Sequence, residues 1–247
     1  GPEPSTRVTA MSETATPGTP ADSFDVGAAW TWAWRQFNRH WKVLTLAVAP
    51  YLVALMIAYG AYLAVLIPAT ITDMRRGRSS PEDDQALVIA LLGVYVAVLV
   101  ISLLGSIAYR NLVAAALLVA DGGTPTPRSA LSLRRSGRTL TLALLNGILV
   151  LVGMVLCFLP GVVVAIFGQF AFVAMVEHDL RPVRALRRSW AFVRRSFWPS
   201  VLVSIVVGLI AYAGTFACLV GLLASLPIAA LMQVHAYRSM SGGQIVA

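Results

Sequence analysis

Charged and chemically reactive residues are scarce in this sequence of 247 residues. Only 12% of the residues are charged, and there are three histidines and two cysteines. The chain has no phosphate-binding glycine loop, no nucleophile elbow and no paired carboxylates. Its histidine and acidic residues do not have the spacing of a zinc motif. The sequence therefore gives little support to an enzyme, and we expect neither a cofactor nor a metal site.

Polar residues are also few, because 58% of the residues are hydrophobic and the mean hydropathy is +0.77. These values lie outside the range of ordinary soluble domains. A helix needs about 20 consecutive apolar residues to cross the hydrocarbon core of a bilayer, and this chain offers several such runs. The composition predicts an integral membrane protein.

The N-terminal segment is the exception to this composition. Residues 1–23 are rich in Pro, Thr, Ser, Glu and Ala, have almost nothing to bury and lack a signal-peptide pattern, so we expect a disordered tail. A leading Gly-Pro is what a protease leaves when it removes a tag, and Met11 is a natural start. Residues 1–10 are therefore expected to be a tag remnant.

The apolar runs predict six membrane-spanning helices in an all-α membrane domain of residues 24–247. The expected spans cover residues 44–69, 86–110, 140–158, 162–178, 199–219 and 222–237. The third and fourth spans are joined by Leu159-Pro160-Gly161, and a Pro-Gly pair is a strong turn signal. The last two spans turn near Gly221. The pattern therefore predicts three helical hairpins.

The basic residues predict the orientation of these spans. Arginine supplies 18 of the 19 basic residues, and the clusters precede the first, third and fifth spans. The clusters are Arg35, Arg39 and Lys42; Arg128, Arg134, Arg135 and Arg138; and Arg181, Arg184, Arg187, Arg188, Arg194 and Arg195. The other connections are charge-balanced or uncharged. By the positive-inside rule, we expect both termini in the cytoplasm and the chain in a bacterial-type plasma (inner) membrane.

Each hairpin follows a basic amphipathic segment, which indicates a threefold internal repeat. In the first segment Trp30, Trp34, Phe37 and Trp41 share one helical face, and the basic residues lie off it. The segment 182–198 repeats this construction, whereas the segment 128–138 has a thinner apolar face. We expect each segment to form an interfacial helix on the cytoplasmic leaflet.

Phospholipid head groups are the ligand that these segments suggest, with anionic lipids preferred. The expected head-group contacts are Arg35, Arg39, Lys42, Arg134, Arg135, Arg138, Arg184, Arg187, Arg188, Arg194 and Arg195. The expected interfacial aromatic residues are Trp30, Trp34, Trp41, Trp190 and Trp198. The alternative is that these helices only brace the bundle and satisfy the orientation rule. We expect no nucleic-acid partner, because no recognition motif accompanies the net charge of +8.

Arg110 interrupts the apolar run of the second span. We expect it to reach the cytoplasmic interface, with residues 112–120 continuing as a projecting or interface-lying helix. The functional alternative is an arginine that lines a substrate path. Polar residues within the spans, such as Asn146 and Gln169, could likewise serve helix packing or line a narrow path for a lipid or an apolar solute.

Glu177 is the other residue with two interpretations. With His178, Asp179 and either His40 or His235 it could form an acid-base or metal cluster. The simpler hypothesis is that Glu177 pairs with an arginine of the segment 182–198, and that Asp179 caps that helix.

The two cysteines, Cys157 and Cys218, fall near the outer ends of the third and fifth spans. A disulfide between them is conceivable on the oxidising side of the membrane. The alternative is that both are free thiols that behave as small apolar residues.

The stretch of residues 159–202 resembles the membrane domain that accompanies some bacterial glycerophosphodiester phosphodiesterases and also occurs in uncharacterised multi-pass proteins. The shared pattern is the Leu-Pro-Gly turn, a span that closes on Glu177, then Ala185-Leu186, Ser189-Trp190, Arg194 and Phe197-Trp198. The resemblance implies no chemistry, because that membrane domain has no assigned activity and the soluble phosphodiesterase barrel is absent here.

Three hypotheses for the function follow. The leading one is a non-catalytic inner-membrane protein that organises anionic lipid, or a partner membrane protein, at the cytoplasmic leaflet. The second is a small transporter or lipid-translocating protein built from the hairpin repeats, and the third is an intramembrane enzyme. A homo-oligomer is compatible with each of them.

Overall fold

The computed structural model describes residues 24–76, 81–133, 136–216 and 221–246. In these ranges the chain forms nine α-helices and no strand. The helices are α1 Val26–Arg76, α2 Pro81–Ala120, α3 Pro127–Ala130, α4 Ser136–Leu156, α5 Phe158–Gly168, α6 Ala171–Glu177, α7 Pro182–Arg195, α8 Phe197–Phe216 and α9 Leu222–Ser241. The all-α prediction is confirmed.

Among the described residues, five helical segments are long and apolar enough to cross a membrane. They are Val26–Pro68, Leu87–Ala120, Ser136–Leu156, Phe158–Glu177 and Phe197–Phe216. Many of their large apolar side chains are exposed, for example Ile57 (69%), Leu92 (61%) and Leu209 (62%). Water disfavours an apolar surface of this extent, whereas lipid chains do not. The structure is therefore compatible with a membrane protein.

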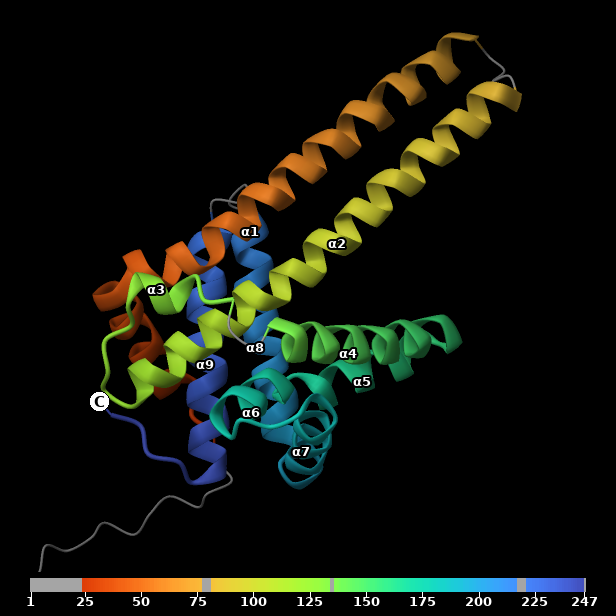
Figure 1. Ribbon diagram of the computed structural model, residues 1–247. Coiled ribbons are helices and arrows are strands. Elements are labelled where there is room, and N and C mark those ends of the chain that lie inside the picture. The colour runs from red at the N-terminus through yellow and green to blue at the C-terminus, as the bar shows by residue number, and fades with distance from the viewer. Residues whose placement is uncertain (1–23, 77–80, 134–135, 217–220, 247) are drawn as a thin grey trace, which may run out of the picture.

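The helix α9, which covers the expected sixth span, is not among these five. The polar side chains of Gln233, His235 and Arg238 lower its hydropathy. It is also the most enclosed long helix, since most of its residues are buried and it packs against α1, α2 and α8. Figure 1 shows α9 in the middle of the bundle. A sixth span stays a prediction.

The first interfacial segment and the first span form one helix, α1, with a kink at His40, whose φ and ψ are −121° and 16°. α1 packs along α2, and the pair extends away from the rest of the molecule in Figure 1. α2 continues without a break past Arg110. The residues that follow, such as Leu112 and Val113, are buried in the main core, so they do not form a projecting or interface-lying helix.

The break between α4 and α5 lies at Cys157, which is extended with φ −171° and ψ 146°. It precedes the expected turn, and Pro160 instead lies in the first turn of α5, where a missing N–H costs nothing. A Cβ atom built on Gly153 would lie 2.8 Å from the Cα atom of Gly161. The backbones of α4 and α5 therefore touch, and only glycine allows this approach.

The expected fourth span is broken into α5 and α6, because the backbone leaves the helical path at Phe170, whose φ and ψ are −91° and 2°. Side chains of other helices satisfy two carbonyl groups near this break. Ser189 Oγ donates to the Phe167 carbonyl (2.6 Å), and Gln233 Nε2 donates to the Gln169 carbonyl (2.7 Å). A break inside a membrane helix is stable when its backbone groups find such partners.

Candidate functional site

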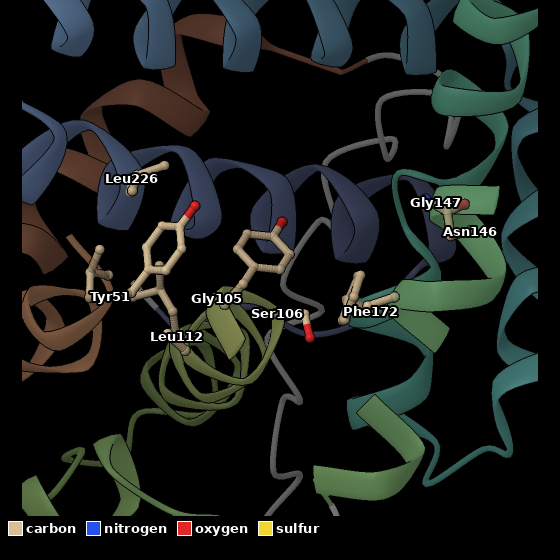
Figure 2. Close-up of a pocket in the computed structure, with 12 residues that line it drawn as sticks. Tyr51, Gly105, Ser106, Leu112, Asn146, Gly147, Phe172 and Leu226 are labelled. Carbon is tan, nitrogen blue, oxygen red and sulfur yellow. The ribbon is translucent and has the colours of Figure 1, made fainter. Parts of the chain in front are cut away.

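A cavity of about 330 Å³ lies between α1, α2, α4, α6 and α9, and it is the strongest candidate for a binding site in the described part of the chain. It is lined by Val48, Tyr51, Gly105, Ser106, Ala108, Tyr109, Leu112, Ala143, Asn146, Gly147, Phe172 and Leu226. Figure 2 shows Tyr51 and Leu112 at one side of this cavity and Asn146 and Gly147 at the other. Its volume lies within the usual range of small-molecule pockets, about 300–1,000 Å³.

Tyr51 separates this cavity from a second one. A space of about 260 Å³ lies between α1, α2 and the segment around α3, and Tyr51 and Ala108 line both cavities. The ring of Tyr51 lies against Gly105 of α2, where an added Cβ atom would come within 2.2 Å of it. Glycine at position 105 therefore makes room for the aromatic ring that divides the two spaces.

Tyr109, which lines the first cavity, begins a chain of hydrogen bonds that crosses the bundle. The Tyr109 hydroxyl donates to Gln233 Oε1, and Gln233 Nε2 donates to the Gln169 carbonyl. The Gln169 side chain then donates to the Ser200 carbonyl (3.0 Å) and accepts from Ser204 Oγ (2.8 Å). These bonds tie α2, α9 and α8 to the break between α5 and α6, which indicates packing as the role of Gln169.

Asn146 differs from Gln169, because it lies on the cavity and its buried Oδ1 atom has no hydrogen-bond partner within the described structure. The same atom faces Gly168, since a Cβ atom added there would come within 2.1 Å of it. A carboxamide at the edge of an apolar cavity can orient a ligand through a single hydrogen bond.

Arg238 of α9 organises a second polar cluster. Its side chain is 9% exposed, and it donates from Nε to Glu177 Oε1 (3.0 Å) and from Nη1 to Asp121 Oδ1 (2.6 Å). It also donates to the Gln244 carbonyl (3.2 Å). Glu177 thus pairs with an arginine of α9 and not of the segment 182–198, so the expected partner was wrong although the bracing interaction is present.

The neighbouring His178 extends this cluster, since its Nε2 atom lies 4.0 Å from Glu177 Oε2. Its Nε2 atom lies 3.4 Å from the Tyr237 hydroxyl, which accepts from Arg188 Nε (3.3 Å). Within the described ranges, no three His, Cys, Asp or Glu side chains gather closely enough to hold a metal ion.

Asp179 does not cap α7. It lies in the left-handed region with φ 47°, and its carboxylate pairs with Arg138 (3.3 Å) at the start of α4. Arg110 donates to Asn111 Oδ1 (3.0 Å), and together with Arg138 and Asp179 it lines a small polar pocket of about 20 Å³. Arg110 is therefore close to the N-terminal end of α4.

The basic residues of α7 lie on one face of the helix. Ala185, Leu186, Ser189 and Val193 are buried, and the arginines are exposed. The exposed arginines of α7 and its N-cap are Arg181, Arg184, Arg187, Arg188, Arg194 and Arg195. The Arg188 side chain contacts Tyr237, whereas the side chains of the other five make no hydrogen bond or ion pair with any residue that the structure describes.

The remaining predicted contact residues divide into exposed and undescribed ones. Arg35, Arg39 and Lys42 are exposed, and so are Trp30, Trp34, Trp41 and Trp198. Trp190 is partly buried against Phe167. Arg134, Arg135 and Cys218 lie outside the described residues, and Cys157 is an exposed free cysteine.

The sequence did not predict Tyr51 and Tyr109 as residues of a binding site. Both occur in apolar runs where tyrosine is common, and the only signal was Gly105, which leaves room for a ring on a neighbouring helix. The polar cluster was missed in part as well, because the partnership of Asp121, Glu177 and Arg238 joins residues far apart in the sequence.

The fold and the site together define an all-α protein with several long apolar helices, an apolar cavity among them and an arginine-rich surface helix. The chain belongs to the DUF7847 family, a domain of unknown function whose model matches residues 39–247.

The chain is similar to uncharacterized proteins of mycobacteria. This chain is 29% identical over 232 residues to the uncharacterized protein Mb2590 of Mycobacterium bovis. The aligned region covers 92% of this chain and 71% of the relative. The uncharacterized protein Rv2560 of Mycobacterium tuberculosis is 28% identical with the same coverage. No solved structure matches the chain. The comparisons support the uncharacterised family and give no support to a relationship with glycerophosphodiester phosphodiesterases.

Proposed function

We propose that this protein is a non-catalytic inner-membrane protein that binds anionic phospholipid at the cytoplasmic leaflet through α7. The observation that carries the proposal is the face of α7 where Arg184, Arg187, Arg194 and Arg195 are exposed without a protein partner among the described residues. The opposite face of α7 is buried against α4, α5 and α6. The helix is thus fixed on the bundle with its charged side outward.

Guanidinium groups in this setting favour phosphate ligands. A guanidinium is planar, always charged and able to donate two parallel hydrogen bonds to a phosphate. Each arginine near an anionic membrane surface contributes on the order of 1 kcal/mol. The exposed Trp198, 78% accessible at the start of α8, has the amphipathic ring that is common at head-group depth.

The proposed topology has six spans in three hairpins, with both termini in the cytoplasm. It is supported by contacts that gather the basic ends of the helices. Arg138 at the start of α4 pairs with Asp179 after α6, and Arg238 near the end of α9 pairs with Glu177 at the end of α6. If α6 ends at the inner face, α4 starts there and α9 ends there, as the positive-inside rule requires.

A lipid-translocating protein is the second candidate, and the cavity that reaches Asn146 favours it. Translocation needs a path that lipid can follow from one leaflet to the other. The two cavities are divided by Tyr51 in this conformation. The lipid-binding proposal needs no such path and therefore comes first. A partner membrane protein or a second copy of the chain could use the same surface of α7.

Native mass spectrometry of the detergent-solubilised protein tests the lipid-binding proposal. We expect phosphatidylglycerol to bind more tightly than phosphatidylcholine, with a preference that declines as salt rises. Changing Arg184, Arg187 and Arg194 together to Gln is expected to lower this preference at least about fivefold.

The matched control changes the same three residues to Lys, which keeps the charge and is expected to keep most of the preference. Equal binding of the two lipids to the natural protein, or a preference that survives the triple Gln change, would rule the proposal out.

A further inference from the structure

Three of the helices that line the cavity, α2, α4 and α6, also line the polar pocket at Arg110 and Arg138. On α4, Ala143 lines the cavity and Thr139 lines the polar pocket, four residues apart. On α6, Phe172 lines the cavity and Val176 the pocket, again four residues apart. On both helices about one turn, or about 6 Å along the axis, therefore separates a residue that lines the apolar space from one that lines the polar pocket.

We propose that this composite site holds one membrane phospholipid, with an acyl chain in the cavity and its phosphate between Arg110 and Arg138. The inference rests on the proposed function in one respect, because both require that the protein binds lipid. It uses residues other than the arginines of α7, and it concerns a single held lipid and not a surface layer.

The lining of the cavity selects an apolar chain. Eight of its twelve lining residues are Val, Leu, Ala, Phe or Gly, and Tyr51 is the ninth with a largely apolar side chain. The Ser106 hydroxyl donates to the Leu103 carbonyl (2.6 Å) of its own helix. Water needs two to four polar partners to be stable in a buried site, and such a surface offers few. Because the helices around the cavity also carry exposed apolar side chains, the surrounding lipid is the source of chains closest to it.

The polar pocket selects the head group. Its described lining residues include two guanidinium groups and one carboxylate, that of Asp179, so the net charge of these residues is positive. The Arg138 and Asp179 side chains are 47% and 55% exposed, and an ion pair this exposed is weak enough for a phosphate to compete with it. The pocket, about 20 Å³, has room for about one water-sized group, such as a phosphate oxygen.

The glycines of the chain allow a selective test. Gly147 lines the cavity, and a Cβ atom added there meets nothing within 4 Å. Gly147→Phe is thus expected to fill the cavity without a backbone clash, and Ala143→Phe is a second filling variant on the same helix. Gly208 of α8 is equally open but does not line the cavity, so Gly208→Phe is the matched control.

The experiment uses the full chain in vesicles that contain phosphatidylglycerol with a photoactivatable group in one acyl chain. After illumination, we expect cross-links in the peptides that contain Tyr51, Gly105 and Asn146. Gly147→Phe and Ala143→Phe are each expected to lower these cross-links at least fivefold, and Gly208→Phe is expected to leave them unchanged. The elution profile on size-exclusion chromatography checks that each variant is folded.

Two further arms separate the possible results. A photoactivatable fatty acid that labels the cavity as well as the phospholipid, or labelling that survives both filling variants, overturns the inference. The change of Arg184, Arg187 and Arg194 to Gln is expected to lower the lipid preference of the surface and to leave the cavity cross-links in place. Failure of the surface proposal and failure of the cavity proposal are therefore distinguished. If Arg138→Gln does not weaken the phospholipid cross-links, the proposed position of the phosphate is wrong.

Discussion

Arg238 is the residue that best shows how polar groups are retained inside this bundle. It lies on the most enclosed helix, yet its guanidinium contacts two carboxylates and a backbone carbonyl. Glu177 Oε2 makes no hydrogen bond and lies 4.0 Å from His178 Nε2, so the pair with Arg238 at 3.0 Å is the main compensation for the Glu177 charge. A buried charge without a partner is strongly unfavourable.

Arg238→Met is therefore expected to destabilise the protein by about 3–5 kcal/mol, because it leaves Glu177 without its partner. Thermal unfolding in detergent micelles measures the effect. Asp121→Asn serves as the control, since the Asp121 side chain is 58% exposed and its pair with Arg238 is expected to contribute only about 0–1 kcal/mol. Equal losses for the two variants would show that burial does not govern this cluster.

Residue roles could be predicted from the sequence only where the partner was local. The exposure of Arg35, Arg39 and the α7 arginines followed from their place beside apolar runs. The partner of Glu177 could not be predicted, because Arg238 is 61 residues away and the α7 arginines are nearer in the sequence. The uncompensated Asn146 was foreseen only as a choice between packing and a path.

At the scale of the helix, the close contact of α4 with α5 depends on two glycines. A Cβ atom at Gly153 would press on the Gly161 backbone, whereas one at Gly147 of the same helix meets nothing. Gly153→Ala is therefore expected to destabilise the protein by about 1–3 kcal/mol through overpacking. Gly147→Ala gains the same helix propensity without a clash and is expected to be neutral or stabilising.

Thermal unfolding of both variants in the same detergent isolates the clash from the propensity. A Gly153→Ala protein as stable as Gly147→Ala would mean that α4 and α5 can move apart at no cost, contrary to the tight contact described above.

The helices were predicted well, and the breaks between them less well. Long apolar runs predicted the long apolar helices, since hydrophobic length is a local property of the sequence. The break at Phe170 was not predicted, because the side chains that satisfy the carbonyls next to it, Ser189 and Gln233, come from α7 and α9. The Leu159-Pro160-Gly161 motif indicated a turn correctly but the turn falls at Cys157, just before it.

For the whole molecule, the sequence predicted the class and left the arrangement open. The exposed apolar surfaces of α1, α2, α4, α5 and α8 agree with a membrane protein. The threefold repeat stays a prediction, and its middle copy is reduced to the four-residue helix α3 among the described residues. The position of α9 at the centre of the bundle required the structure, because a helix enclosed by other helices does not need the hydropathy of a lipid-exposed span.

Cysteine labelling in intact cells tests the central claim, the cytoplasmic position of the arginine-rich face, most directly. Both reporter proteins carry Cys218→Ala. The first reporter is the exposed Cys157, which lies between α4 and α5 and at the outer face in the proposed topology. The second is Ala191→Cys, which lies among the exposed arginines of α7. A membrane-impermeant maleimide added outside is expected to label Cys157 in intact cells. In a protein that also carries Cys157→Ala, the same reagent is expected to label the Ala191→Cys site only after permeabilisation. Labelling at position 191 in intact cells would invert the topology and contradict the lipid-binding account.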